Sequence, residues 1–223
     1  MSVIVLLLSF NLQAGEKINE VVEAQSDGQV SIESMRGVVE IVGWEKNQVS
    51  VSGELDDKAT GYTFKTENGF TVFKVNMPKN NRSSDWSRSD GSDLKIFLPV
   101  GSDLTFESVN GDVSVKAVSG GTNLHTVNGS IEAVELSGQI RLATVNGSIK
   151  SSQLNGKIKL ATVNGRVKDE NSKGKVHYET VNGKIIGNTQ ANRVYVENVN
   201  GKIELTLKQV EELEIGTVNG DID

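Results

Sequence analysis

The sequence predicts an all-β protein, a single-domain parallel β-solenoid with 18-residue coils and a more irregular β cap at its N-terminal end. The first observation is a Val-Asn-Gly motif that occurs seven times, with its asparagines at Asn110, Asn128, Asn146, Asn164, Asn182, Asn200 and Asn219. The same 18-residue step separates each asparagine from the next, except that the last step, from Asn200 to Asn219, is longer by one. So regular a period over half of a chain indicates a repeat architecture whose units stack on one another.

The second observation is a weaker mark halfway through each repeat. A glycine precedes the next Val-Asn-Gly glycine by nine residues at Gly120, Gly138, Gly156 and Gly174, and Asn192 takes that place once. Each coil therefore divides into two halves, and each half is expected to be a turn followed by a short strand. Asn-Gly favours turns because both residues tolerate positive φ.

The third observation is the alternation of apolar residues after each turn, which is typical of strands with one buried face. Alignment on the 18-residue period stacks these positions into columns rich in β-branched residues, which favour strands over helices. Strands stacked in this way are parallel and in register, about 4.8 Å apart. One such column is Val113, Ile131, Ile149, Val167, Ile185, Ile203 and Ile222, and a second is Leu124, Leu142, Leu160, Tyr178 and Val196. The asparagine column is interpreted as structural, with side-chain amides bonded along the stack.

Residues 1–14 are interpreted as a signal peptide. The apolar run at residues 3–8 is too short to span a bilayer and resembles the core of a secretory signal, with cleavage after Ala14. The alternative is a buried first strand. Export would place the protein in the periplasm, on the cell surface or outside the cell, and no transmembrane helix is expected.

Residues 15–105 are expected to form the irregular cap, either as broader first coils or as a sandwich-like end, and residues 106–223 the regular coils. Cap strands are expected at 29–34, 38–42, 48–52, 62–66, 70–75 and 94–98, where apolar residues alternate. A cap protects the open strand edge of a stack. At the other end, Asp221 and Asp223 are expected to discourage end-to-end pairing.

A polar stretch at residues 78–93 interrupts the cap. Long loops in compact domains are often functional, so Arg82, Trp86 and Arg88 form a candidate contact loop for a sugar or a protein partner. The alternative is an insertion whose Trp86 packs against the cap.

Charge provides the main functional signal. The whole chain carries −6, yet residues 141–202 hold 11 Lys and Arg against 4 Asp and Glu. Two columns at turns collect like charges, which repel at this spacing. The candidate ligand-binding residues are therefore Lys157, Lys175 and Arg193 in one column and Arg166, Lys184 and Lys202 in the other. An anionic envelope polymer is the predicted partner; the alternatives are a solubilising surface and self-association with the acidic part of a second copy.

Several other chemistries are not expected. The chain has no cysteine, which excludes disulfides and thiolate sites. The only two histidines, His125 and His177, fall in different columns, and no cluster of acids is expected to stack beside the column of Arg141 and His177. No catalytic residue, metal or cofactor is therefore predicted. Nucleic acid is not an expected partner, because the chain is acidic and no aromatic residues alternate with the basic columns.

Three stretches resemble the bacterial putative-adhesin β-solenoid family: residues 37–44 its early strand and Gly-Trp turn, residues 98–104 its entry to the repeats, and the Val-Asn-Gly units its coils. The resemblance covers nearly the whole mature chain. It implies an exported, non-catalytic solenoid and carries no catalytic residues.

The sequence thus predicts an exported, adhesin-like binding or scaffold protein. The alternative is a structural or protein-interaction module of the envelope that binds no glycan. A polysaccharide-degrading β-helix enzyme is the third possibility, which would need a carboxylate cluster.

Overall fold

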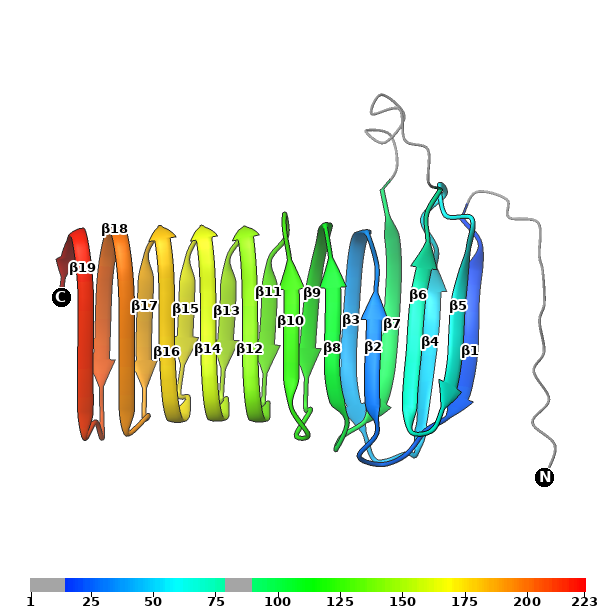
Figure 1. Cartoon of the computed structure of the whole chain (residues 1–223), viewed down its shortest axis with the longest axis horizontal. Helices are drawn as coiled ribbons and strands as arrows, with labels where there is room; N and C mark the ends of the chain where they lie inside the picture. The colour runs from blue at the N-terminus through cyan, green and yellow to red at the C-terminus, as the bar shows by residue number, and fades with distance from the viewer. Residues whose placement is uncertain (1–14, 79–89) are drawn as a thin grey trace.

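The computed structural model describes residues 15–78 and 90–223. The strands stack side by side along the long axis of the molecule, with β19 at one end and β1 and β5 at the other (Figure 1). The expected signal peptide and the candidate contact residues Arg82, Trp86 and Arg88 lie outside the described residues.

No helix occurs in the described ranges, so the all-β prediction is confirmed. The cap contains β1 (Lys17–Glu23), β2 (Gln29–Glu33), β3 (Arg36–Trp44), β4 (Gln48–Glu54), β5 (Gly61–Glu67), β6 (Phe70–Asn76) and β7 (Ser92–Pro99). The regular coils contain β8 (Asp103–Ser108), β9 (Asn110–Lys116), β10 (Thr122–Thr126), β11 (Ile131–Val134), β12 (Ser137–Asn146), β13 (Ile149–Ser152), β14 (Asn155–Asn164), β15 (Val167–Glu170), β16 (Lys173–Asn182), β17 (Ile185–Thr189), β18 (Arg193–Leu207) and β19 (Glu212–Ile222).

The strands of the regular coils form two facing layers. The long-strand face contains β8, β10, β12, β14, β16 and the first halves of β18 and β19; the short-strand face contains β9, β11, β13, β15, β17 and the second halves. Pairing is parallel and joins residues one 18-residue coil apart, as in Leu124 with Leu142. The predicted parallel, in-register coils are confirmed.

The core fills the space between the two faces. The predicted columns supply it: Ile140 and Ile158 point inward from the long strands, and Ile149 and Val167 from the short ones, all buried. Alternation along each strand places the intervening residues outside. A single coil buries too few side chains to offset the entropy of ordering it, so neighbouring coils stabilise one another.

The Val-Asn-Gly turn differs from the prediction in its backbone. None of the asparagines of the described ladder has positive φ, and among its glycines only Gly201 does. Glycine is needed there for close approach, because a Cβ on Gly165 would overlap the backbone carbonyl of Gly147 one coil away. The residue before the motif is the one that points inward: Thr144 and Thr162 are buried and donate to glycine carbonyls of the previous coil at 2.9 and 3.0 Å.

Positive φ is found instead at the halfway turns that precede β10, β12, β14 and β16. Gln153 and Asn171 have φ of 56° and 58°, and Gly156 and Gly174 follow with 132° and 92°. The left-handed backbone conformation therefore occurs at the halfway turns and, apart from Gly201, not at the Val-Asn-Gly motifs. Glycine adopts this conformation without steric cost.

The asparagine ladder is confirmed as a structural feature. Each Nδ2 donates to the Oδ1 of the asparagine one coil earlier, from Asn128 to Asn219, at distances from 2.8 to 3.3 Å. The amide groups thus hydrogen-bond to one another along the outer edge of the coils, as in stacked cross-β arrays.

The cap contains both irregular first coils and a sandwich-like end. The coil of β2 and β3 lies between that of β6 and β7 and that of β8 and β9, so stacking order departs from chain order. Antiparallel β4 and β1 extend one face and β5 extends the other, giving a sandwich-like end. Strand β1 was not among the expected strands because only Ile18 of its seven residues is buried, so no alternation marks it.

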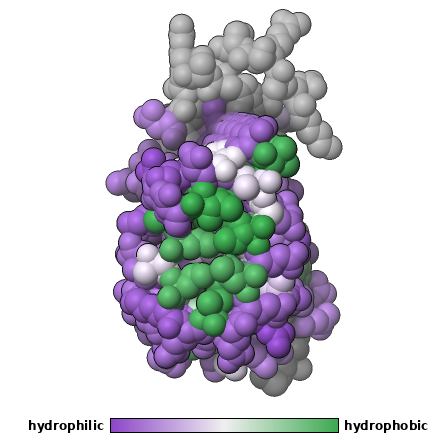
Figure 2. All heavy atoms as spheres, turned by 90° about the vertical axis from the view of Figure 1, so that its left-hand side faces the viewer, coloured by the Kyte–Doolittle hydropathy of each residue, from purple (hydrophilic) through white to green (hydrophobic). Residues whose placement is uncertain are grey.

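The other end of the stack exposes apolar side chains. Figure 2 shows a hydrophobic area framed by polar residues at this end, where Leu213 is 45% and Ile222 is 50% exposed. Asp221 and Asp223 flank Ile222 in the chain, so charge adjoins the apolar surface. Of the described residues, none forms a helix long and apolar enough to cross a membrane.

Candidate functional site

The outer side of the long-strand face displays three of the six predicted binding residues, and the other three lie at its edge. Inward residues such as Ile158 and Leu160 alternate with outward ones such as Lys157 and Lys159. Because β12, β14, β16 and β18 pair in register, outward residues at equivalent positions of successive coils become direct neighbours.

The first basic column lies near the start of the long strands. Lys157 pairs with Lys175, and Lys175 with Arg193, as the repeat period predicts. Lys175 Nζ lies 4.4 Å from the centroid of the Tyr195 ring, a cation–π contact, whereas Arg193 Nε lies 3.5 Å from Glu212 Oε2. Among the described residues, only the last member of this column has a carboxylate partner.

The second column lies at the opposite end of the same strands. Arg166 lies in the turn between β14 and β15, beyond the far end of the strand that carries Lys157. Lys184 Nζ lies 2.7 Å from Glu204, and Lys202 Nζ lies 3.0 Å from Glu204 and 2.5 Å from Asp223. Hydrogen bonds to Asp223 and Glu204 raise the pKa of Lys202, and those from Lys184 and Lys202 lower the pKa of Glu204.

The structure thus divides the six predicted residues into two groups. Lys184, Arg193 and Lys202 are held by acids of neighbouring strands, while Lys157, Arg166 and Lys175 have no carboxylate partner within the described ranges. The repeat period predicts the columns but not this division, because the acids do not recur from coil to coil: Glu204 stands in register with Ile186 of the coil before.

Two further cations join Lys157 and Lys175. Arg141 on β12 and Lys173 on β16 are exposed on the same outer side, again without a described carboxylate partner. We call Arg141, Lys157, Lys173 and Lys175 the free cation cluster. Arg141 and Lys173 belong to the basic segment of the sequence but were not among the candidate residues; alternation around Lys175 was the signal that could have identified Lys173.

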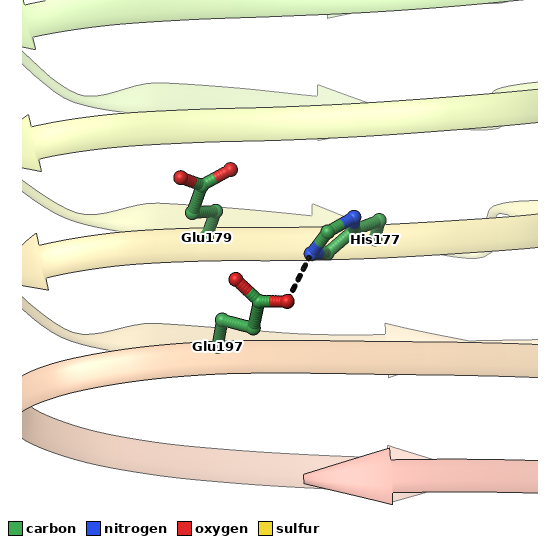
Figure 3. Close-up of side chains that lie close together, drawn as sticks. All are labelled: His177, Glu179 and Glu197. Carbon is green, nitrogen blue, oxygen red and sulfur yellow. Dashed lines mark ion pairs between the residues drawn. The ribbon is translucent and has the colours of Figure 1, made fainter. Parts of the chain in front are cut away.

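A second group of polar side chains lies beside this cluster. His177 and Glu179 on β16 and Glu197 on β18 project from the same side (Figure 3). His177 Nε2 lies 3.6 Å from Glu197 Oε1, and one ligand atom from each residue lies within 4.8 Å of the others. Lys159 Nζ lies 2.5 Å from Glu179 Oε2.

This arrangement corrects one prediction. No cluster of acids was expected beside the column of Arg141 and His177, yet Glu179 and Glu197 are direct neighbours in the adjacent column. The signal was present in the alignment, because Glu197 follows Glu179 at the 18-residue period and Glu179 is the next outward residue after His177.

A concavity of about 380 Å³ lies elsewhere, near the junction of cap and coils. It is lined by apolar residues including Met35 and Met77 and by Glu33, Glu107 and His125, which follow one another on neighbouring strands. Lys74 forms an ion pair with Glu33. The concavity is thus separate from both basic columns.

No protein-family model matches the sequence, and no curated protein matches it closely enough to count as a relative. Among solved structures, a putative adhesin from Bacteroides fragilis is similar with a TM-score of 0.55 and 10% identity, over 95% of this chain and 99% of that one. A putative cell adhesion protein from Clostridium sporogenes gives a TM-score of 0.41 and 10% identity over 93% and 98%. A putative lipid binding protein from Parabacteroides distasonis gives 0.47 and 12% over 93% and 96%.

At these identities the likeness concerns the fold. The Bacteroides fragilis structure agrees with the resemblance to the putative-adhesin solenoid family that the repeat motifs indicate.

Proposed function

We propose that this protein is an exported, non-catalytic binding or scaffold protein that contacts an anionic polymer of the cell envelope. It would act in the periplasm, on the cell surface or outside the cell. The adhesin name of the Bacteroides fragilis structure is in keeping with a binding role. The observation that carries the proposal is the free cation cluster.

Like charges about 4.8 Å apart on neighbouring strands repel, so Lys157 beside Lys175 costs stability unless a partner offsets it. Elsewhere on the solenoid the described structure offsets such charges internally, as with Lys150 and Glu132 at 2.7 Å. A polyanion would supply the missing counter-charges along the row.

Cations with and without a carboxylate partner should contribute differently to polymer binding. Lys184, Arg193 and Lys202 must give up existing carboxylates before they bind a ligand, whereas Lys157, Lys173 and Lys175 need not. Arg166 lies at the far edge and can take part only if the polymer crosses the face.

The test is cosedimentation of the purified chain with isolated envelope fractions at about 0.1 M and about 1 M salt, where the Debye length falls from about 10 to about 3 Å. Two variants carry the same change of charge. One replaces Lys157, Lys173 and Lys175 with glutamine, and the matched control replaces Lys184, Arg193 and Lys202.

We expect binding at low salt that weakens at high salt, is lost in the first variant and is largely kept in the control. Equal binding by both variants, or binding that salt does not change, would overturn the polyanion proposal. Salt-independent binding to envelope protein alone would favour the alternative, a protein-interaction module.

A polysaccharide-degrading activity would need a carboxylate cluster in a hollow, and Glu33, Glu107 and His125 gather in the concavity. Release of oligosaccharides from the same envelope fractions, abolished by Glu107→Gln, would replace the binding proposal with an enzymatic one.

A further inference from the structure

We propose that His177, Glu179 and Glu197 form a binding site for a divalent transition-metal ion of the zinc class on the outer side of the long-strand face. The site is separate from the basic columns and goes beyond the proposed polymer binding. It lies on β16 and β18, which pair in parallel and in register.

The backbone positions the three side chains. His177 and Glu179 are two residues apart on β16 and therefore project on the same side, while Glu197 is the direct neighbour of Glu179 on β18. Both strands belong to a continuous hydrogen-bonded ladder, which provides the rigid support that a metal site requires.

The ligand atoms are close to the separation that zinc needs. Zinc bonds to nitrogen and carboxylate oxygen are about 2.0–2.2 Å long, so tetrahedral ligand atoms lie about 3.4 Å apart. His177 Nε2 and Glu197 Oε1 are 3.6 Å apart, and all three ligand atoms lie within 4.8 Å. In Figure 3 Glu197 approaches the imidazole while the Glu179 carboxylate turns toward the preceding coil, so rotation of one flexible side chain would complete the set.

The imidazole itself points to a missing partner. His177 Nε2 is enclosed yet makes no hydrogen bond to any described residue, and its 3.6 Å separation from Glu197 is too long for one. An unsatisfied enclosed nitrogen costs free energy, which a bound cation would recover.

The ligand types select the class of metal. Imidazole nitrogen with carboxylate oxygen suits zinc and similar borderline ions, whereas calcium and magnesium take oxygen ligands alone. Three protein ligands leave a fourth position open to solvent.

Lys159 opposes the ion, and this gives the proposal a second, independent test. Its ammonium lies 2.5 Å from Glu179 Oε2 and holds that carboxylate away from the imidazole. Removing the ammonium should release Glu179 and remove a repelling charge, so Lys159→Gln should bind the metal several-fold more tightly.

The experiment uses the untagged full chain, treated with a chelator and then titrated with Zn²⁺ by calorimetry. The chain has two histidines, so imidazole NMR signals distinguish His177 from the matched control His125, which also projects from a long strand beside one glutamate. Circular dichroism checks that each variant remains folded.

We expect one ion per chain, with Zn²⁺ shifting the His177 signals and not those of His125. His177→Ala and Glu197→Gln should each weaken binding more than about tenfold, because even the loss of a residue that only supports a metal ligand costs about 10–100-fold. His125→Ala should bind as the parent does.

The proposal fails if Zn²⁺ binds no more tightly to the parent than to His177→Ala, or if His125→Ala loses as much affinity. It also fails if Lys159→Gln weakens binding. Those results would mean that His177 is only an ion-pair partner of Glu197.

Discussion

The Tyr178 hydroxyl donates a 2.7 Å hydrogen bond to Asp169 Oδ2 in the interior of the solenoid, where both side chains are fully buried. Ser151 and Ser172 each donate to Asp169 Oδ1 at 2.6 Å. Asp169 thus occupies an inward column that also holds small or apolar residues such as Val115 and Ala133. Three hydroxyl donors stabilise this carboxyl, which has no cationic partner among the described residues.

The buried carboxyl should make stability depend on pH. Burial raises the pKa of Asp169 despite these hydrogen bonds. Its contribution is therefore complete below the unfolded-state pKa of about 3.9 and is lost as the pH rises through the higher folded-state pKa. We expect the free energy of unfolding of the parent, relative to Asp169→Asn, to fall as the pH rises above about 4 and through the raised folded-state pKa. Urea unfolding of both proteins across that range measures the difference, and parallel curves would contradict the prediction.

Breaking the buried ion pair of the cap should lower the stability of the protein strongly. Arg36 contacts Asp56 through two nitrogens, with Nη2 at 2.8 Å and Nε at 3.0 Å from Oδ2, and Asp56 is 1% exposed. Removing one partner of a buried pair leaves an uncompensated charge, so Asp56→Ala should cost about 3–5 kcal/mol. Urea unfolding measures the loss, and the surface change Lys95→Ala, which removes an exposed pair with Glu40, should cost about 1 kcal/mol or less.

The glycines of Val-Asn-Gly should not tolerate a side chain. A methyl group on Gly165 would meet the carbonyl of Gly147, so Gly165→Ala should separate two coils locally and cost about 1–3 kcal/mol or more. Gly216 is the matched control, because a Cβ there would be 3.9 Å from its nearest neighbour. Thermal unfolding should show a clear loss for the first variant and little change for the second; equal losses would show that packing between coils is not the cause.

Replacing an asparagine in the middle of the ladder should lower the stability of the protein more than replacing the one at its end. Asn146→Ala removes two side-chain hydrogen bonds, with Asn128 and Asn164, whereas Asn219→Ala removes one, with Asn200. At about 0.5–1.5 kcal/mol for each bond, the first change should cost about 1–2 kcal/mol and the second about half of that. Chemical unfolding of the two variants provides the comparison. A larger loss for Asn219→Ala would mean that the bonds do not act locally.

Much of the candidate site could be placed from the sequence alone. The 18-residue period brings Lys157 beside Lys175 because in-register pairing converts sequence spacing directly into neighbourhood. The same rule pairs Glu179 with Glu197. Which cations are neutralised could not be derived from the basic columns, because the acids do not repeat. Glu204 replaces Ile186 of the coil before, Glu212 pairs across the longer last step and Asp223 follows the last motif.

By itself the sequence determined the coil length, the parallel register, the asparagine ladder and the inward columns. In a strict repeat, equivalent residues of successive coils pair with one another and therefore have the same neighbours. The tertiary structure decided what does not repeat. It placed the coil of β2 and β3 between two later segments, buried Arg36 against Asp56 and enclosed Asp169 beneath Tyr178. These contacts join residues with no common spacing, and only the closure of the whole core determines which of them meet.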